Sequence, residues 1–222
     1  MFWAQFFSRH AHAQGILKMH SVTEGVLKST KHCWNMCLRT TFCHPAKHFP
    51  PKLVLGIETS CDDTGAAVVD ETGNILGEAL HSQQEVHLKT GGIIPPVAQQ
   101  LHRENITRIV EKALEASGIS PNELSAIATT TKPGLALSLG VGLEYSLKLV
   151  DQYKKPFIPI HHMEAHALTI RLTNPVEFPF LVLLLSGGHC ILAVAQGVSD
   201  FLLLGQSLDI APGDMLDKVI FQ

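Results

Sequence analysis

The chain has 222 residues, of which 45% are hydrophobic and 17% are charged, with a formal net charge of −3. These values are typical of a globular protein of one or two domains. Its apolar stretches are all shorter than the roughly 18 residues that a membrane-spanning helix needs, so we expect no membrane partner. From residue 51 onward, 11 Lys and Arg oppose 19 Asp and Glu, and only small basic groups occur, at Lys154-Lys155 and His102-Arg103. The sequence therefore indicates no nucleic-acid surface by charge alone.

Residues 1–50 have a different composition from the rest of the chain. They carry six Lys and Arg against one acid, Glu24, and are rich in Ser, Thr and His. This composition predicts a mitochondrial transit peptide outside the fold, and hence a location in the mitochondrial matrix. A zinc knuckle is the weaker alternative, because its candidate ligands are irregularly spaced: Cys33, Cys37, Cys43, His44 and His48. Cys61 and Cys190 are predicted to be free thiols.

The first folding signals are three short strands, predicted at residues 53–57, 65–69 and 75–81 with polar turns between them. Apolar residues at helical spacing then predict a helix from Pro95 to near Gly118, and a second helix from Leu135 to about Tyr153. Strands are expected at 125–130 and 157–160, and a further helix carries His162 and His166.

The order strand, turn, strand, turn, strand recurs about 125 residues later, at 180–185, 190–195 and 201–205. This repeat predicts an α/β protein with the duplicated-domain architecture of actin-like ATPases (ASKHA). We expect a first domain at residues 51–175 and an incomplete beginning of a second domain at 176–222.

His162 and His166 are the first candidate metal ligands. Four-residue spacing on a helix puts both imidazoles on one face, where they can share an ion. Glu164 lies about 200° around the helix from each, so it points away from that ion. This argues against a zinc peptidase of the His-Glu-x-x-His type, in which the glutamate directly follows the first histidine.

Two loops are candidates for binding phosphate. In the first hairpin, the carboxylates and hydroxyls of Ser60, Asp62, Asp63 and Thr64 could orient a metal-bound phosphate, although the same residues are ordinary in turns. In the second, the small residues Ser186-Gly187-Gly188 could hold an anion with backbone amides. For Gly134, Gly140 and Gly142 we favour close helix packing over a role in the site.

Five motifs, in order, resemble those of the tRNA N6-adenosine threonylcarbamoyltransferase (TsaD) family, and of its mitochondrial branch most closely. They are GIETSCDDT at 56–64, HLKTGGIIPPVAQQLHRENI at 87–106, HHMEAH at 161–166, LLSGGH at 184–189 and SLDIAPGDMLDK at 207–218. The resemblance implies transfer of a threonylcarbamoyl group from threonylcarbamoyl-AMP to N6 of the adenosine beside the anticodon. The tRNA substrates would be those that read codons beginning with A.

The resemblance also implies roles for individual residues. His162 and His166 match metal-binding histidines, and the divalent ion could be Fe, Zn or Mg. The matches to substrate-binding positions are Leu184, Leu185, Ser186, Gly187, Gly188 and Asp217. No covalent enzyme intermediate is needed, so no catalytic nucleophile is predicted. The implied partners are tRNA and, in a homodimer, a second copy of the chain.

The family's second domain continues beyond Val219 and supplies a third, acidic metal ligand, so we expect this 222-residue chain by itself to be inactive. Two other functions stay open at this point. One is a non-catalytic, truncated isoform that acts only as a binding module. The other is an actin-like ATPase or sugar kinase, against which the paired histidines argue.

Overall fold

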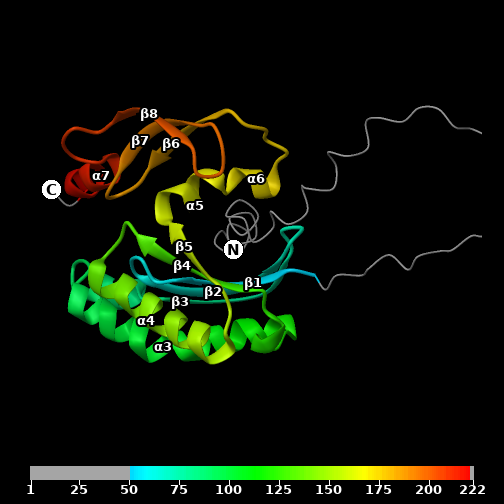
Figure 1. Cartoon of the computed structure of the whole chain (residues 1–222). Helices are drawn as coiled ribbons and strands as arrows, with labels where there is room; N and C mark the ends of the chain where they lie inside the picture. Colours follow the sequence, from blue (N-terminus) through cyan, green and yellow to red (C-terminus); the bar gives the residue numbers. More distant parts are fainter. Residues whose placement is uncertain (1–50, 221–222) are drawn as a thin grey trace, which may run out of the picture.

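The computed structural model describes residues 51–220, which fold into two β-sheets with helices packed against them (Figure 1). The predicted transit peptide at 1–50, with its candidate zinc ligands, lies outside the described residues.

The larger sheet has five strands in the order β3-β2-β1-β4-β5. Antiparallel pairing joins β1 to β2 and β2 to β3, whereas β4 runs parallel to both β1 and β5. Every residue of β1 is buried, as expected of a central strand that is covered on both faces. The strands are β1 (Leu53–Glu58), β2 (Asp63–Asp70), β3 (Ile75–Ser82), β4 (Ala126–Lys132) and β5 (Phe157–His161).

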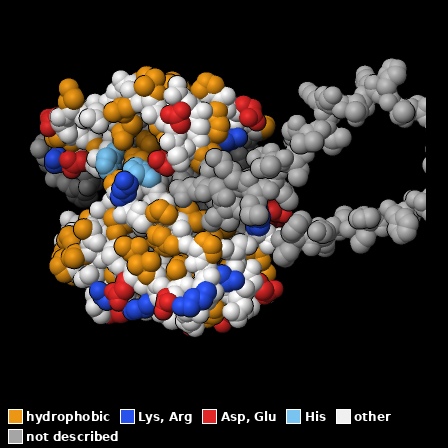
Figure 2. All heavy atoms as spheres, in the orientation of Figure 1, with side chains coloured by type: hydrophobic (Ala, Val, Ile, Leu, Met, Phe, Trp, Pro, Cys, Tyr) orange, Lys and Arg blue, Asp and Glu red, His pale blue; other side chains and the backbone are white. Residues whose placement is uncertain are grey.

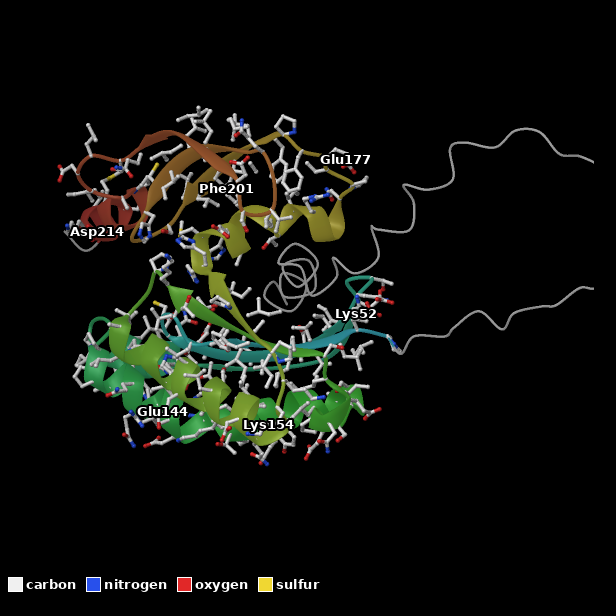
Figure 3. The ribbon with its side chains drawn as sticks, in the orientation of Figure 1. Lys52, Glu144, Lys154, Glu177, Phe201 and Asp214 are labelled. Atoms are coloured by element: carbon white, nitrogen blue, oxygen red, sulfur yellow. The ribbon has the colours of Figure 1, made fainter. Side chains whose placement is uncertain are left out.

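Two long helices cover one face of this sheet. Helix α3 (Pro95–Ser117) begins with two prolines and ends at Gly118, whose φ of 66° is the left-handed conformation common after helix ends. It packs beside α4 (Ala136–Tyr153), and both contribute to a core with Leu55 and Ile57 of β1. The exposed side chains Glu144 and Lys154 mark the outer side of this helical layer (Figure 3).

Helix α5 (His162–Leu168) lies on the opposite face of the sheet, together with α6 (Ile170–Thr173). It is shared between the two sheets: Ala165 and Leu168 join the core of the five-stranded sheet, and Ala167 packs against Val182 of the second sheet. Phe201 of the second sheet also contacts this core, between that sheet and α5 (Figure 3). Helix α5 therefore helps to set how the two sheets face each other, together with Phe180 and Phe201, which pack against the core of the five-stranded sheet.

The second sheet is an antiparallel meander of β6 (Phe180–Leu185), β7 (Cys190–Ala195) and β8 (Phe201–Gln206), followed by α7 (Pro212–Ile220). Along β6, Val182 is buried against α5, but the neighbouring Leu181 and Leu183 are 64% and 59% exposed. Apolar residues on both faces are typical of a strand that is covered on both sides.

The predicted strands and long helices are confirmed, with ends that shift by one or two residues. The widest shifts are the start of β2, at Asp63 instead of Gly65, and the end of β4, at Lys132 instead of Thr130. Three short elements were not predicted: α2 (Gln84–Lys89), the 3-10 turn at Pro121–Glu123, and α6. They are too short for a helical repeat of apolar residues to stand out. No helix within 51–220 combines the length and apolar character that crossing a bilayer would need.

Gly77 allows β3 and α3 to approach closely. A Cβ at Gly77 would lie 2.3 Å from the Ser117 backbone nitrogen and 2.5 Å from the Ala113 carbonyl oxygen. We expect G77A to lower the free energy of unfolding by roughly 1–3 kcal/mol, because backbone atoms must shift. In contrast, a Cβ at Gly140 of α4 meets nothing within 4 Å. Because Ala favours a helix more than Gly does, G140A should raise the free energy of unfolding by up to about 1 kcal/mol. Urea unfolding of both variants measures this, and equal midpoints would contradict the packing of β3 on α3.

Candidate functional site

Three strand ends meet at one edge of the five-stranded sheet. Because β1, β4 and β5 run parallel, their carboxyl ends lie side by side, which is where ligands bind in open α/β sheets. The chain leaves β1 through Ser60, leaves β4 through Gly134, and leaves β5 directly into α5 at His162. The backbone amide of Leu135 donates to the Ser60 carbonyl over 2.8 Å, which ties two of these exits together.

A cavity of about 680 Å³ lies between these strand ends and the first turn of the second sheet. This volume is ordinary for a small-molecule site. Figure 2 shows histidine side chains gathered where the part with β6–β8 faces the larger sheet. The lining residues are Ser60, Cys61, Ile93, Pro133, Gly134, Leu135, His162, Met163, His166, Leu184, Leu185, Ser186, Gly187, Gly188 and His189. The structure thus brings together the predicted histidine pair and the predicted small-residue turn.

The two histidines are placed so that one ion could contact both. Their Nε2 atoms are 3.1 Å apart, and the rings meet edge to face with centroids 4.6 Å apart. Two nitrogens that each lie about 2.0–2.1 Å from a shared zinc ion are separated by roughly 3.0–3.4 Å. The spacing therefore fits bidentate binding. Within 51–220, however, no group of three or more His, Cys, Asp or Glu side chains comes together for a metal.

Both imidazoles favour the neutral form that binds metal. Burial lowers the pKa of His162 to about 4, with smaller contributions from His166, His189 and His161. Burial also lowers the pKa of His166. A neutral imidazole offers a lone pair, whereas a protonated one offers only donors. The pair is therefore available to a cation at neutral pH.

Behind His162 lies a buried carboxylate that the sequence analysis did not select. Glu58 is 3% exposed, and its Oε1 accepts the Ser60 backbone amide over 2.6 Å. The Thr130 hydroxyl donates to its other oxygen. Burial raises the pKa of Glu58, whereas hydrogen bonds from Ser60 and Thr130 lower it by a smaller amount. An acid at the end of an otherwise apolar strand was the signal that could have identified it.

The facing wall is the turn Ser186–His189. Ser186 Oγ accepts the amides of Gly188 and His189 over 3.3 and 2.9 Å. The Ser186 amide donates to the His189 carbonyl over 2.8 Å, so of the amides that we expected to face an anion those of Ser186 and Gly188 are bonded within the turn. The first turn of α7 packs on it, since the Gly213 amide donates to the Ser186 carbonyl over 3.2 Å. Asp217, a predicted substrate contact, lies further along this helix.

The predicted phosphate loop is only partly in the cavity. Ser60 lines it, but Asp62, Asp63 and Thr64 are not among its lining residues. Thr64 is fully buried in β2, where its hydroxyl bonds to His102. Asp63 Oδ1 is buried without a hydrogen-bond partner among the described residues. Of the four candidates, Ser60 is thus the one that lines the cavity, whereas Thr64 is buried because β2 begins earlier than predicted.

Cys61 and His189 are cavity residues that were not predicted as site residues. Burial, followed by the charge of Asp62, raises the pKa of the Cys61 thiol to about 11. A protonated thiol is a poor nucleophile. Both Cys61 and Cys190 are free thiols, as predicted.

The glycines after β4 pack against the loop that follows β1. A Cβ at Gly142 would lie 2.4 Å from Thr59 Oγ1, and one at Gly134 would lie 2.6 Å from the Ser60 carbonyl oxygen. Close packing is therefore confirmed for both, and it occurs beside the cavity. The prediction of close packing is wrong for Gly140, because a Cβ there would meet nothing within 4 Å.

Residues 74–220 match the family model of TsaD, the tRNA N6-adenosine threonylcarbamoyltransferase. The chain belongs to this family. It is 81% identical to the mitochondrial family member of Homo sapiens over 182 residues, which are 82% of this chain and 44% of that protein. The Danio rerio mitochondrial protein is 73% identical over 76% of this chain and 42% of its own length. The chain thus spans less than half the length of these relatives.

A family member from a Wolbachia strain is 44% identical over 76% of this chain and 50% of its own length. Among solved structures, YeaZ from Pseudomonas aeruginosa aligns with a TM-score of 0.47 and 16% identity, covering 72% of this chain and 67% of that one. The ethanolamine utilization protein EutJ from Carboxydothermus hydrogenoformans aligns with a TM-score of 0.43 and 19% identity, covering 78% of this chain and 57% of that one.

His102 of α3 anchors the loop beneath the cavity. It is fully buried; its Nε2 lies 3.0 Å from the Cys61 carbonyl and its Nδ1 lies 2.8 Å from Thr64 Oγ1. Since a carbonyl only accepts, Nε2 carries the proton and Nδ1 accepts from the threonine. His102 is therefore held as a neutral imidazole and contributes nothing to a basic surface.

His102 makes stability sensitive to acid. Burial lowers its pKa below the ordinary 6.5, and the nearby His87 adds to this, while the Cys61 carbonyl, Asp62 and Asp63 oppose it. The unfolded chain then binds the proton first, so stability is full above pH ~6.5 and falls as the pH drops below that value, by at most about 1.4 kcal/mol per unit from this group.

We expect H102Q to lose less stability than the unmodified protein when the pH is lowered from 7.5 to 5.5, measured by urea unfolding at each pH. The remaining loss reports His162 and His166, whose pKa values are also lowered. An identical pH dependence in both proteins would contradict a neutral, buried His102.

Proposed function

We propose that this chain forms the metal- and adenylate-binding half of a threonylcarbamoyltransferase that modifies N6 of the adenosine beside the anticodon. The tRNAs would be those that read codons beginning with A. The observation that carries this proposal is that the His162–His166 pair and the Ser186–His189 turn line the same cavity, in a member of the family. Because the chain spans 44% of its human relative, the complete reaction is proposed for a protein of the relatives' length.

His162 and His166 would hold one divalent metal ion. Their Nε2 separation of 3.1 Å and their lowered pKa values support this assignment. When bound, the ion would supply Lewis-acid polarisation of a phosphate or carbonyl oxygen. Imidazole ligands suit iron and zinc better than magnesium, which prefers oxygen, but Fe, Zn and Mg all remain candidates.

The other cavity residues would bind and orient threonylcarbamoyl-AMP. We assign the adenylate to the turn formed by Ser186, Gly187 and Gly188, with Leu184 and Leu185 beside it and Asp217 as a further contact. The adenosine N6 would attack the carbamoyl carbonyl. The N6–carbon bond forms, the carbon–oxygen bond to phosphate breaks, and AMP leaves while N6 loses a proton. Binding both reactants would supply most of the rate by proximity.

A sugar kinase or simple ATPase is not favoured, because the chain belongs to the threonylcarbamoyltransferase family. A non-catalytic binding module stays a candidate for the 222-residue chain, because the described residues bring only two potential ligands to the metal position. The two candidates share the same cavity and differ in turnover.

We further propose that the protein works in mitochondria, as the names of its human, mouse and rat relatives state for those proteins. The basic, acid-poor residues 1–50 would serve as the transit peptide. The tRNA would be the macromolecular partner, and a homodimer is the proposed assembly.

Metal binding should be weak and should depend on both histidines. Two imidazoles leave at least two positions of a tetrahedral ion to water. We expect the purified chain to take up zinc with modest affinity, and H162A or H166A to remove the stoichiometric ion, measured by calorimetric titration and elemental analysis. If the double variant binds zinc as well as the unmodified chain does, the site lies elsewhere, and Cys33, Cys37 and Cys43 become the first residues to replace.

Turnover tests the proposed reaction. The chain is supplied with tRNA, a divalent metal and threonylcarbamoyl-AMP, and the modified nucleoside is measured by mass spectrometry. In parallel, a non-hydrolysable adenylate analogue is titrated. We expect measurable binding without product from the 222 residues, and product from a protein of the relatives' full length. Absence of both analogue binding and full-length activity would refute the function, whereas robust product from the short chain would refute the division of roles.

A further inference from the structure

We propose that Ser60, backed by Glu58, is a positioning residue that holds His162 in the tautomer whose Nε2 lone pair faces the cavity. This inference rests on the proposed metal site and adds a second layer of residues behind it. Ser60 lies in the loop after β1 and His162 opens α5, so 102 residues of sequence separate the two.

Ser60 sits between the imidazole and the buried carboxylate. Its Oγ is 3.0 Å from His162 Nδ1, and Glu58 Oε1 lies 3.8 Å from the same nitrogen. The Ser60 backbone amide donates to Glu58 Oε1, so the carboxyl group is held beside this contact. The contact is well enclosed: Ser60 is 2% exposed, and the His162 side chain is 20% exposed.

The oxygen of Ser60 can accept a hydrogen bond from the imidazole. A serine hydroxyl has lone pairs as well as one proton, so an Nδ1–H of His162 can donate to Ser60 Oγ. Glu58 Oε1, 3.8 Å from Nδ1, is a further oxygen on this side of the ring. We therefore assign the proton of the neutral imidazole to Nδ1, which leaves Nε2 as an acceptor. In the metal-free protein that lone pair can accept from His166 Nε2, 3.1 Å away.

The packing around Ser60 keeps the hydroxyl in place. Its amide donates to Glu58 over 2.6 Å, and its carbonyl accepts from Leu135 over 2.8 Å. Gly134 presses against it, since a Cβ there would lie 2.8 Å from the Ser60 Cβ. A metal-binding histidine commonly donates its other ring nitrogen to such a fixed acceptor, and removal of that acceptor typically costs about 10–100-fold in metal affinity.

The test compares S60A with a matched control, S138A. Ser138 of α4 is also fully buried, but its Oγ has no hydrogen-bond partner among the described residues. Nitrogen-15 NMR of the histidine rings at pH 7.5, without metal, reports which ring nitrogen carries the proton. Zinc titration then reports affinity.

We expect the unmodified protein and S138A to show His162 protonated on Nδ1, and S60A to show a mixture with the Nε2-protonated form. We also expect about 10-fold or more weaker zinc binding in S60A. The variant E58Q should give a smaller loss than S60A, because its amide oxygen can still accept from Ser60. Finding Nε2 protonated in the unmodified protein would overturn the proposal, as would S60A behaving like S138A in both measurements.

The two measurements keep this proposal separate from the proposed function. If the unmodified protein binds no zinc, the proposed metal site fails, yet the ring-nitrogen signals still decide whether Ser60 sets the tautomer. If zinc binds through His162 and His166 but S60A changes neither tautomer nor affinity, the positioning role fails alone. An affinity loss in S60A with unchanged tautomer would assign the effect to packing and would also overturn it.

Discussion

The parallel alignment of β1, β4 and β5 is the constraint on which the site depends. Parallel strands end at the same edge of a sheet, so the residues that follow each strand meet there although they are far apart in the sequence. Ser60, Gly134 and His162 come together in this way. A different strand order would separate the buried carboxylate from the histidine that it supports.

Helix α5 couples this edge to the second sheet. Its first turn carries His162, and its small residues Ala165 and Ala167 allow one sheet to pack on each side. The histidine pair therefore lies at the junction of two cores, and the Ser186–His189 turn is held opposite to it. The apolar contacts of this helix, with those of Phe180 and Phe201 on the core of the five-stranded sheet, thus hold the two walls of the cavity together.

Burial and hydrogen bonding prepare the polar residues around the cavity. His162 and His166 are held neutral by desolvation, Glu58 is buried with donors around it, and His102 is locked between a carbonyl and a hydroxyl. Each of these groups costs free energy to bury unless it is hydrogen-bonded. Buried ionisable groups with shifted pKa values are common at sites that bind ions or perform chemistry.

The sequence by itself determined the strands, the long helices, the histidine pair and the small-residue turn, because these depend on apolar periodicity and on four-residue helical spacing. It also carried the family motifs at 56–64 and 161–166. Only the tertiary structure decided that Thr64 turns inward to His102, and that Ser60 contacts His162 beside the buried Glu58. These outcomes rest on contacts between residues up to about a hundred positions apart, and local periodicity contains no information on such contacts.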